Sequence, residues 1–96
     1  MRTELSKTMQ ELRQEFEDNR IQFILTELET ATTFCDLALS SKNPEKTRRN
    51  TDHASLGYKT ALRMANKANL QGEVKEEFDR KVGRVRDLLR HLGQEI

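Results

Sequence analysis

The segment that decides the fold is ASLGYKTALRMANKA, residues 54–68. At about 100° per residue along a helix, eight of its side chains lie on one side, and five of the eight are Ala or Gly. They are Ala54, Gly57, Tyr58, Ala61, Leu62, Met64, Ala65 and Ala68. Small side chains let a second helix approach closely, and the ring of Tyr58 then fills the remaining space. We therefore expect this helix to pack closely against another. The expected contacts of Ala54, Tyr58 and Ala61 are Ile24, Leu28, Ala31 and Cys35.

The composition indicates a single small domain, residues 1–96, of the all-α class. One Pro, four Gly and many helix-favouring residues occur in the 96 positions, and no run of alternating β-branched residues predicts a strand. Hydrophobic and charged residues each make up 34% of the chain, so the apolar residues must lie on narrow stripes. A chain of this length has room for one core but not for a deep substrate cleft as well. These properties favour a protein that is not an enzyme.

The net charge of +1 provides no overall field for binding nucleic acid or an anionic membrane. The charge is unevenly distributed, however. Residues 11–41 contain two basic and seven acidic residues, a net charge of −5, whereas residues 42–67 contain seven basic and two acidic residues, a net charge of +5. Two neighbouring helices of opposite charge attract each other across a hairpin, and this interpretation is preferred to a basic patch that binds phosphate.

No apolar run approaches the roughly 18 residues that a membrane span requires, and MRTELSKTMQ lacks the apolar core of a signal peptide. A single cysteine, Cys35, excludes an internal disulfide. We therefore expect a cytoplasmic protein that does not bind membranes.

The hydrophobic pattern predicts an antiparallel three-helix bundle with a long first helix. We expect helices at about 4–41, 44–69 and 73–92. In the first helix, one row of residues spaced seven apart runs past Asn19 without a change of phase, which favours one continuous helix. That row is Met9, Phe16, Phe23, Thr30 and Leu37. We expect residues 1–18 to form an N-terminal helical extension and residues 19–93 to form the three-helix core.

Two turns are predicted from local signals. Asn43 suits the N-cap of the second helix and Pro44 its first position, where a missing N–H costs nothing. Residues 69–72 form the second turn, and Gly93 suits the end of the third helix.

The spacing of Ala54, Tyr58 and Ala61 resembles the second helix of a tetratricopeptide repeat (TPR), in which small, aromatic and small residues follow in that order. The resemblance extends from Phe34 to Ala61 and implies a single repeat-like helical hairpin. The chain departs from the family in its longer loop and in the absence of a second repeat. Ordinary close packing of two helices explains the same residues.

His53 and Gly57 are similar to a histidine phosphotransfer domain, in which a phosphorylated His lies one turn before a Gly. The resemblance implies phosphotransfer by His53 as an alternative function. The chain departs from that pattern at Leu56, where a basic residue is expected, and in its helix count, because those domains are usually four-helix bundles. A surface histidine and a glycine needed for close packing explain the same two residues.

The remaining chemistry-bearing residues indicate no catalytic, metal or cofactor site. Cys35 lies on a core stripe and His91 in the last turn of the third helix, so the spacing of His and Cys suits no metal ion. The arginines of the third helix alternate with acids, which argues against a nucleic-acid interface.

The preferred function is a non-catalytic protein–protein interaction module whose partner and pathway the sequence does not name. The polar N-terminal helix carries an apolar stripe that it cannot bury by itself, and a twofold pair of chains is the commonest solution for such a stripe. We therefore expect a homodimer through the N-terminal helix. Leu56 points away from the Tyr58 stripe and completes the expected interaction surface. That surface comprises Leu5, Met9, Leu12, Phe16, Phe23 and Leu56.

Overall fold

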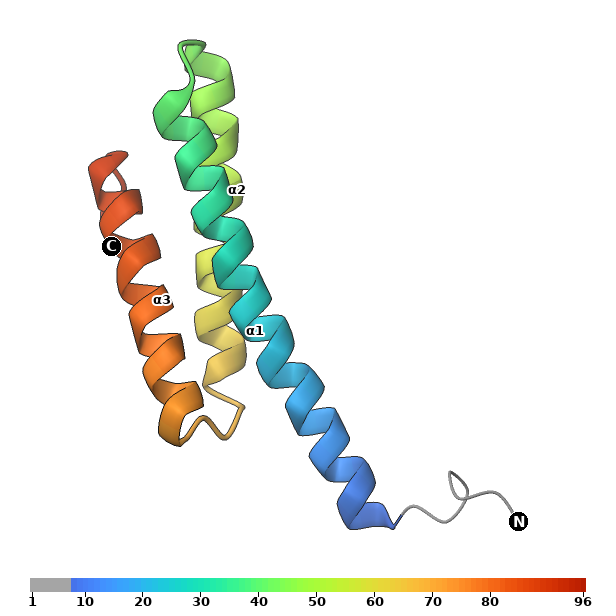
Figure 1. Ribbon diagram of the computed structural model, residues 1–96. Helices are drawn as coiled ribbons and strands as arrows, with labels where there is room; N and C mark the ends of the chain where they lie inside the picture. The colour runs from blue at the N-terminus through green and yellow to red at the C-terminus, as the bar shows by residue number, and fades with distance from the viewer. Residues whose placement is uncertain (1–7) are drawn as a thin grey trace.

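The computed structural model describes residues 8–96, which form three α-helices and contain no strand. The helices are α1 (Met9–Ser40), α2 (Pro44–Ala65) and α3 (Gly72–His91). Figure 1 shows α1 and α2 as an antiparallel hairpin with α3 alongside, and the N-terminal end of α1 projecting past the α2–α3 connection. The predicted all-α, three-helix architecture with a long first helix is confirmed.

The start of α1 differs from the prediction of a helix from residue 4. Thr8 has an extended backbone and forms a capping box with Glu11: its hydroxyl accepts from the Glu11 N–H at 3.1 Å, and its own N–H donates to the Glu11 carboxylate at 2.8 Å. The helix therefore begins at Met9 and then continues through Asn19 without a break. Leu5 lies outside the described residues.

The end of α2 also differs from the prediction, because the helix stops at Ala65 instead of residue 69. The backbone then tightens into turns in which Lys67 and Ala68 donate to carbonyls three residues earlier. Side chains of α1 hold this connection. Arg20 donates to the Lys67 carbonyl at 3.0 Å, and the Glu17 carboxylate accepts from the Asn69 N–H at 2.8 Å. Contacts with another helix therefore accompany the early end of α2.

The other boundaries agree with the sequence to within one residue. Asn43 caps α2 by accepting from the N–H groups of Glu45 and Lys46 at 2.9 and 3.3 Å, and Pro44 occupies the first turn. Gly93, with φ of +94°, ends α3 while Gln94 donates back to the Leu89 carbonyl at 2.9 Å. This pattern is a Schellman motif, which suits a glycine because it requires a positive φ.

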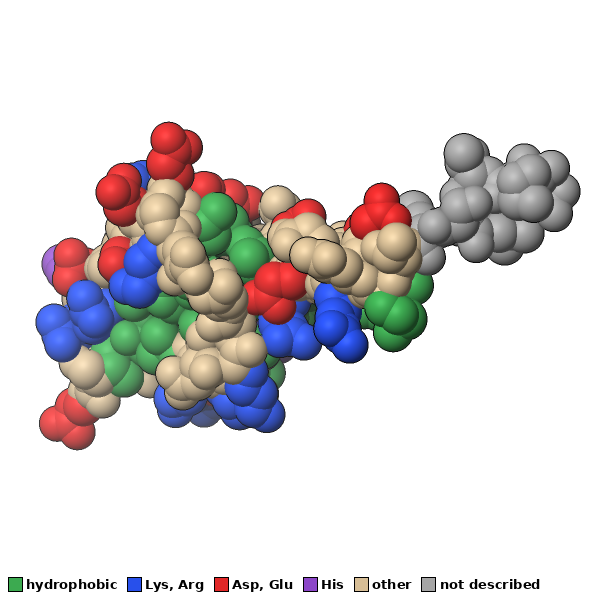
Figure 2. All heavy atoms as spheres, turned by 90° about the horizontal axis from the view of Figure 1, so that it is seen from below, with side chains coloured by type: hydrophobic (Ala, Val, Ile, Leu, Met, Phe, Trp, Pro, Cys, Tyr) green, Lys and Arg blue, Asp and Glu red, His purple; other side chains and the backbone are tan. Residues whose placement is uncertain are grey.

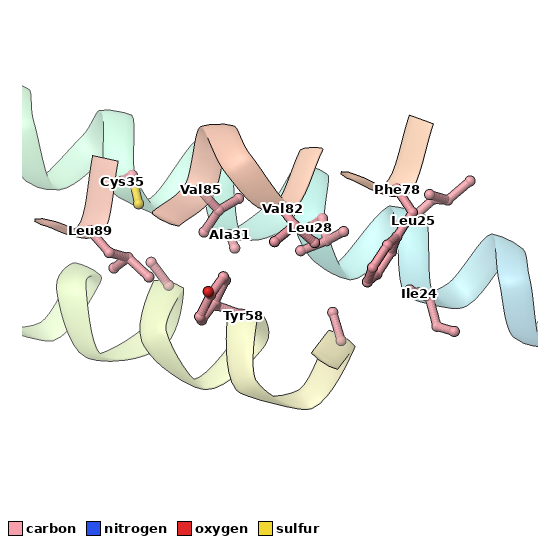
Figure 3. Packing of buried hydrophobic residues seen from close by; sticks show 12 residues of the cluster. Ile24, Leu25, Leu28, Ala31, Cys35, Tyr58, Phe78, Val82, Val85 and Leu89 are labelled. Carbon is pink, nitrogen blue, oxygen red and sulfur yellow. The ribbon is translucent and has the colours of Figure 1, made fainter. Parts of the chain in front are cut away.

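The core lies where the three helices meet, and it contains the contacts expected from the Ala54–Ala68 segment. Tyr58 is surrounded by residues of α1 and α3, as Figure 3 shows. Ala54 and Ala61 are fully buried in the same cluster. The other members of the cluster are Ile24, Leu25, Leu28, Ala31, Cys35, Phe78, Val82, Val85 and Leu89.

Candidate functional site

Large apolar side chains remain exposed along one row of α1. Met9 is 66% exposed, Phe16 65% and Phe23 49%, and Leu37 continues the row at 48%. Each lies a multiple of seven residues from the next, so they share one side of the helix. Figure 2 shows hydrophobic side chains among charged ones on the projecting end of α1. We call Met9, Phe16, Phe23, Thr30 and Leu37 the apolar row. Leu12, which the sequence also placed on this surface, is half-buried.

Leu56 lies beside the middle of this row. It is 64% exposed and lines a shallow hollow of about 260 Å³ between α1 and α2. Thr30 and Phe34 of α1 line the same hollow, together with His53 and Gly57 of α2. Residue spacing alone gave Leu56 no neighbours, and the packing of α1 against α2 brings it next to Thr30 and Phe34.

The exposed side of α2 at this hollow is basic at both ends, which the sequence analysis missed. His53 and Leu56 belong to a set of residues spaced three and four apart, which therefore share one helix face. We call this set the basic row: Lys46, Arg49, His53, Leu56, Thr60 and Arg63. All are exposed except Thr60, which is half-buried. The three-and-four spacing was the signal that could have revealed the row.

His53 is exposed, and its ring lies against Phe34 with the ring centroids 5.0 Å apart and an interplanar angle of 32°. Within residues 8–96, no hydrogen bond or ion pair orients the imidazole. A Cβ atom on Gly57 would lie 3.5 Å from the Ala31 Cβ and 3.5 Å from the Glu27 carbonyl oxygen. Gly57 therefore faces α1, and a methyl group at this position would make ordinary contacts with that helix.

Cys35 is fully buried in the core. Burial raises the pKa of its thiol above the ordinary value, and the neighbouring carboxylate of Asp36 raises it further. A thiol that is both protonated and inaccessible is a poor nucleophile. The structure therefore gives Cys35 the place of a small core residue.

An ion pair between Glu29 and Lys81 connects α1 with α3. Lys81 Nζ lies 2.8 Å from the Glu29 carboxylate, and it is also 3.7 Å from Glu77 on its own helix. The opposite charges of α1 and α2 were expected to meet across their hairpin, but no ion pair between those two helices is present in residues 8–96. The basic row thus faces outward.

No group of three or more His, Cys, Asp or Glu residues that could hold a metal ion occurs among the described residues. None of the helices in residues 8–96 has the length and apolar character that crossing a membrane requires. Two other open hollows, of about 420 and 440 Å³, lie near the start of α2 and beside the α2–α3 connection. The charged side chains that line the first are Lys42, Arg48 and Asp52, which include both signs of charge.

In comparisons with known proteins, no family model matched this chain, and neither a curated protein nor a solved structure was significantly similar to it.

Proposed function

We propose that this chain is a non-catalytic helical module that binds other protein surfaces through the apolar row of α1 and Leu56. The observation that supports this proposal is the 65% exposure of Phe16 in a row of α1 in which Met9, Phe23 and Leu37 are exposed as well. Covering a side chain of this size contributes roughly 1.5–3 kcal/mol, so a partner that covered several members of the row would be bound appreciably. Isolated exposed leucines are common on protein surfaces, but a row of large side chains is typical of an interface.

The proposal includes a homodimer through the N-terminal part of α1, because the row can meet its own counterpart on a second chain. The TPR-like interpretation of residues 34–61 is part of the same proposal, with the α1–α2 hairpin acting as a single unit. The division into an extension, residues 1–18, and a core, residues 19–93, stays a prediction, as does the cytoplasmic location.

The experiment that tests the module is affinity capture with matched variants. Immobilised wild-type protein and a Phe16→Glu/Phe23→Glu variant are exposed to the same protein mixture, with Glu73→Gln as a control for a change of charge on an exposed site of α3. Circular dichroism confirms that each variant is folded. We expect proteins, including added copies of this chain, to be retained by the wild type and the control and to be lost from the double variant. Identical retention by all three would contradict the proposal.

A second candidate function is phosphotransfer by His53, and one observation favours it: the imidazole is exposed on the open face of α2, within reach of a partner. In this function a phosphoryl group passes to the His53 ring nitrogen and from there to an acceptor carboxylate. Incubation with acetyl phosphate or a phosphorylated receiver domain tests it. Labelling of the wild type and none of His53→Gln would support phosphotransfer. If the wild type is not labelled under conditions that label a known phosphotransfer protein, the phosphotransfer function is excluded.

A further inference from the structure

We propose that the partner of this surface is a second copy of the same chain, lying parallel to the first, so that α1 of each copy covers the α1–α2 hollow of the other. This inference rests on the proposed function and adds the orientation of the two copies and the contacts between them. Three features support it: the repeat of the apolar row, an acidic row beside it, and the basic row of α2.

The apolar row repeats every seven residues over most of α1. In a parallel pair related by a twofold axis along the helices, each member meets the same residue of the other copy. Phe16 then contacts Phe16, and Phe23 contacts Phe23. This is the contact pattern of one core position in a parallel coiled coil. Thr30 in the fourth place is polar, but it lines the same hollow as Leu56 and Phe34.

A second row on α1 is acidic and polar. Its members follow one another at spacings of three and four residues, so they share one face, and all are exposed. We call this set the acidic row: Glu11, Glu15, Asp18, Gln22, Thr26, Glu29, Thr33 and Asp36. It contains five carboxylates and no basic residue.

The acidic row and α2 lie on opposite sides of the apolar row. On one side, α1 contacts α2, where Ala31 faces Gly57 and Phe34 stacks on His53. On the other side, the acidic row borders α3, where Glu29 pairs with Lys81. The apolar row lies between them, on a part of the α1 surface that neither helix covers.

This arrangement decides the orientation of the second copy. A twofold axis parallel to α1 exchanges the two sides, so the acidic row of each copy lies over the basic row of the other. In an antiparallel pair, equivalent surfaces of the two copies would face each other. The two acidic rows would then be adjacent, and so would the two α2 helices. Like charges opposite one another are unfavourable, and opposite charges set the register of an interface. The parallel pair is therefore favoured.

The positions at which α1 and α2 contact each other identify one charged contact of the pair. Phe34 lies at the height of His53, and the Thr47 hydroxyl donates to the Ala38 carbonyl at 3.4 Å. Arg49 lies between these two points on α2, at the height of Asp36 and Leu37. A second copy in register therefore brings its Asp36 next to Arg49 of the first. Neither residue forms an ion pair within residues 8–96.

Charge reversal tests this contact. We expect the wild type to dimerise at micromolar concentrations in sedimentation equilibrium, and we expect Arg49→Asp and Asp36→Arg each to raise the dimer dissociation constant about tenfold, since reversal changes two attractions into repulsions. A 1:1 mixture of the two variants should recover nearly the wild-type affinity, because both contacts are complementary in the mixed dimer. A matched control is Glu73→Lys, which reverses a charge on α3 away from the interface and should leave the constant unchanged.

Disulfide cross-linking tests the orientation. In a Cys35→Ala background, Phe16→Cys should form an intermolecular disulfide under mild oxidation, because equivalent positions meet in the parallel pair. In an antiparallel pair centred on Phe23, the two copies of position 16 would be about 21 Å apart, at 1.5 Å per residue along the axis. Phe23→Cys should cross-link in either arrangement and serves as the positive control.

A wild-type chain that stays monomeric, a mixture of variants that recovers no affinity, or cross-linking at position 23 without position 16 would each overturn this inference. The proposed function would survive a monomeric result if other proteins were still captured by the wild type and lost from the Phe16→Glu/Phe23→Glu variant. It would fail together with the inference only if that capture were also absent.

Discussion

At the scale of single residues, the close approach of α1 and α2 depends on small side chains at their contact. Ala54 and Ala61 are fully buried, and Ala31 on the facing helix is 1% exposed. Larger side chains here would force the helices apart, since packed interiors tolerate little added volume. Gly57 belongs to the same contact, but its surroundings leave room for one more carbon atom.

Replacing Gly57 with Ala should raise the free energy of unfolding by about 0.5–1 kcal/mol, because glycine in the middle of a helix is entropically costly. The added Cβ would make ordinary contacts, 3.5 Å from Ala31 and from the Glu27 carbonyl. Gly83→Ala is the matched control, since its Cβ would find only Arg86, at 3.9 Å. Urea unfolding at low protein concentration measures the free energy of unfolding of both variants. Stabilisation by the control together with destabilisation by Gly57→Ala would show that the helices approach more closely than described.

Cys35 should make the stability depend on alkaline pH. The folded chain keeps the thiol protonated because burial and Asp36 raise its pKa, whereas the unfolded chain ionises it near the ordinary pKa of 9.0. The unfolded state therefore loses a proton that the folded state retains, and the free energy of unfolding should fall as the pH rises above about 9. Chemical unfolding between pH 8 and pH 10 should show this fall in the wild type and a smaller one in Cys35→Ala. If the free energy of unfolding falls equally with pH in the two proteins, Cys35 is not the cause of the fall.

At the scale of helices, the N-termini of α1 and α2 both carry a side-chain cap, but they differ in how much other helices also stabilise them. Thr8 and Glu11 form a capping box at the projecting end of α1, while Asn43 caps α2 at the exposed turn of the α1–α2 hairpin. Both caps satisfy N–H groups that the helix leaves unpaired. The projecting end depends more on its own cap, since α2 ends before reaching it (Figure 1).

Removing the two caps should therefore have different consequences. Asn43→Ala should lower the global free energy of unfolding by about 1 kcal/mol, because α2 cannot fray without loosening the core. Thr8→Ala should leave global unfolding nearly unchanged and instead speed amide hydrogen exchange in the first two turns of α1. Urea unfolding and residue-resolved hydrogen exchange distinguish these results. An equal global loss in both variants would mean that the N-terminal end of α1 is part of the cooperative core.

At the scale of the whole molecule, the first helix is longer than either helix that packs on it. Glu17 and Arg20 hold the α2–α3 connection, and the segment before them extends beyond it. This geometry leaves Met9 and Phe16 exposed at one end of the molecule. A single chain of this shape leaves an apolar surface at the end of α1 that its own core does not cover.

Deleting Met1–Glu15 should separate folding from association. At concentrations low enough to keep the chain monomeric, we expect the shortened protein to melt within a few degrees of the wild type, because Ile24 and the residues after it form the core. At higher concentrations both proteins should gain thermal stability, since association stabilises the folded state by mass action, but the shortened protein should gain less because it lacks Met9 of the apolar row. Melting curves over a hundredfold range of concentration measure this difference. A large loss of stability in the dilute shortened protein would place the deleted segment in the core.

The sequence by itself determined the class, the number of helices and most of their ends. Asn43, Pro44 and Gly93 act through hydrogen bonds and backbone angles within a few residues, so their effects are visible in the order of residues alone. The small-residue face around Tyr58 was equally clear, because helical periodicity places its members together.

Only the tertiary structure decided which apolar residues stay exposed. Apolar residues occur on several sides of the central part of the first helix, and periodicity does not reveal which part a neighbour covers. The packing of α2 and α3 buries Ile24, Leu28 and Cys35 and leaves Phe23 and Leu37 outside. The same packing brings Leu56 beside Phe34 and ends α2 at Ala65. These outcomes depend on contacts between residues far apart in the chain, and local patterns carry no information about such contacts.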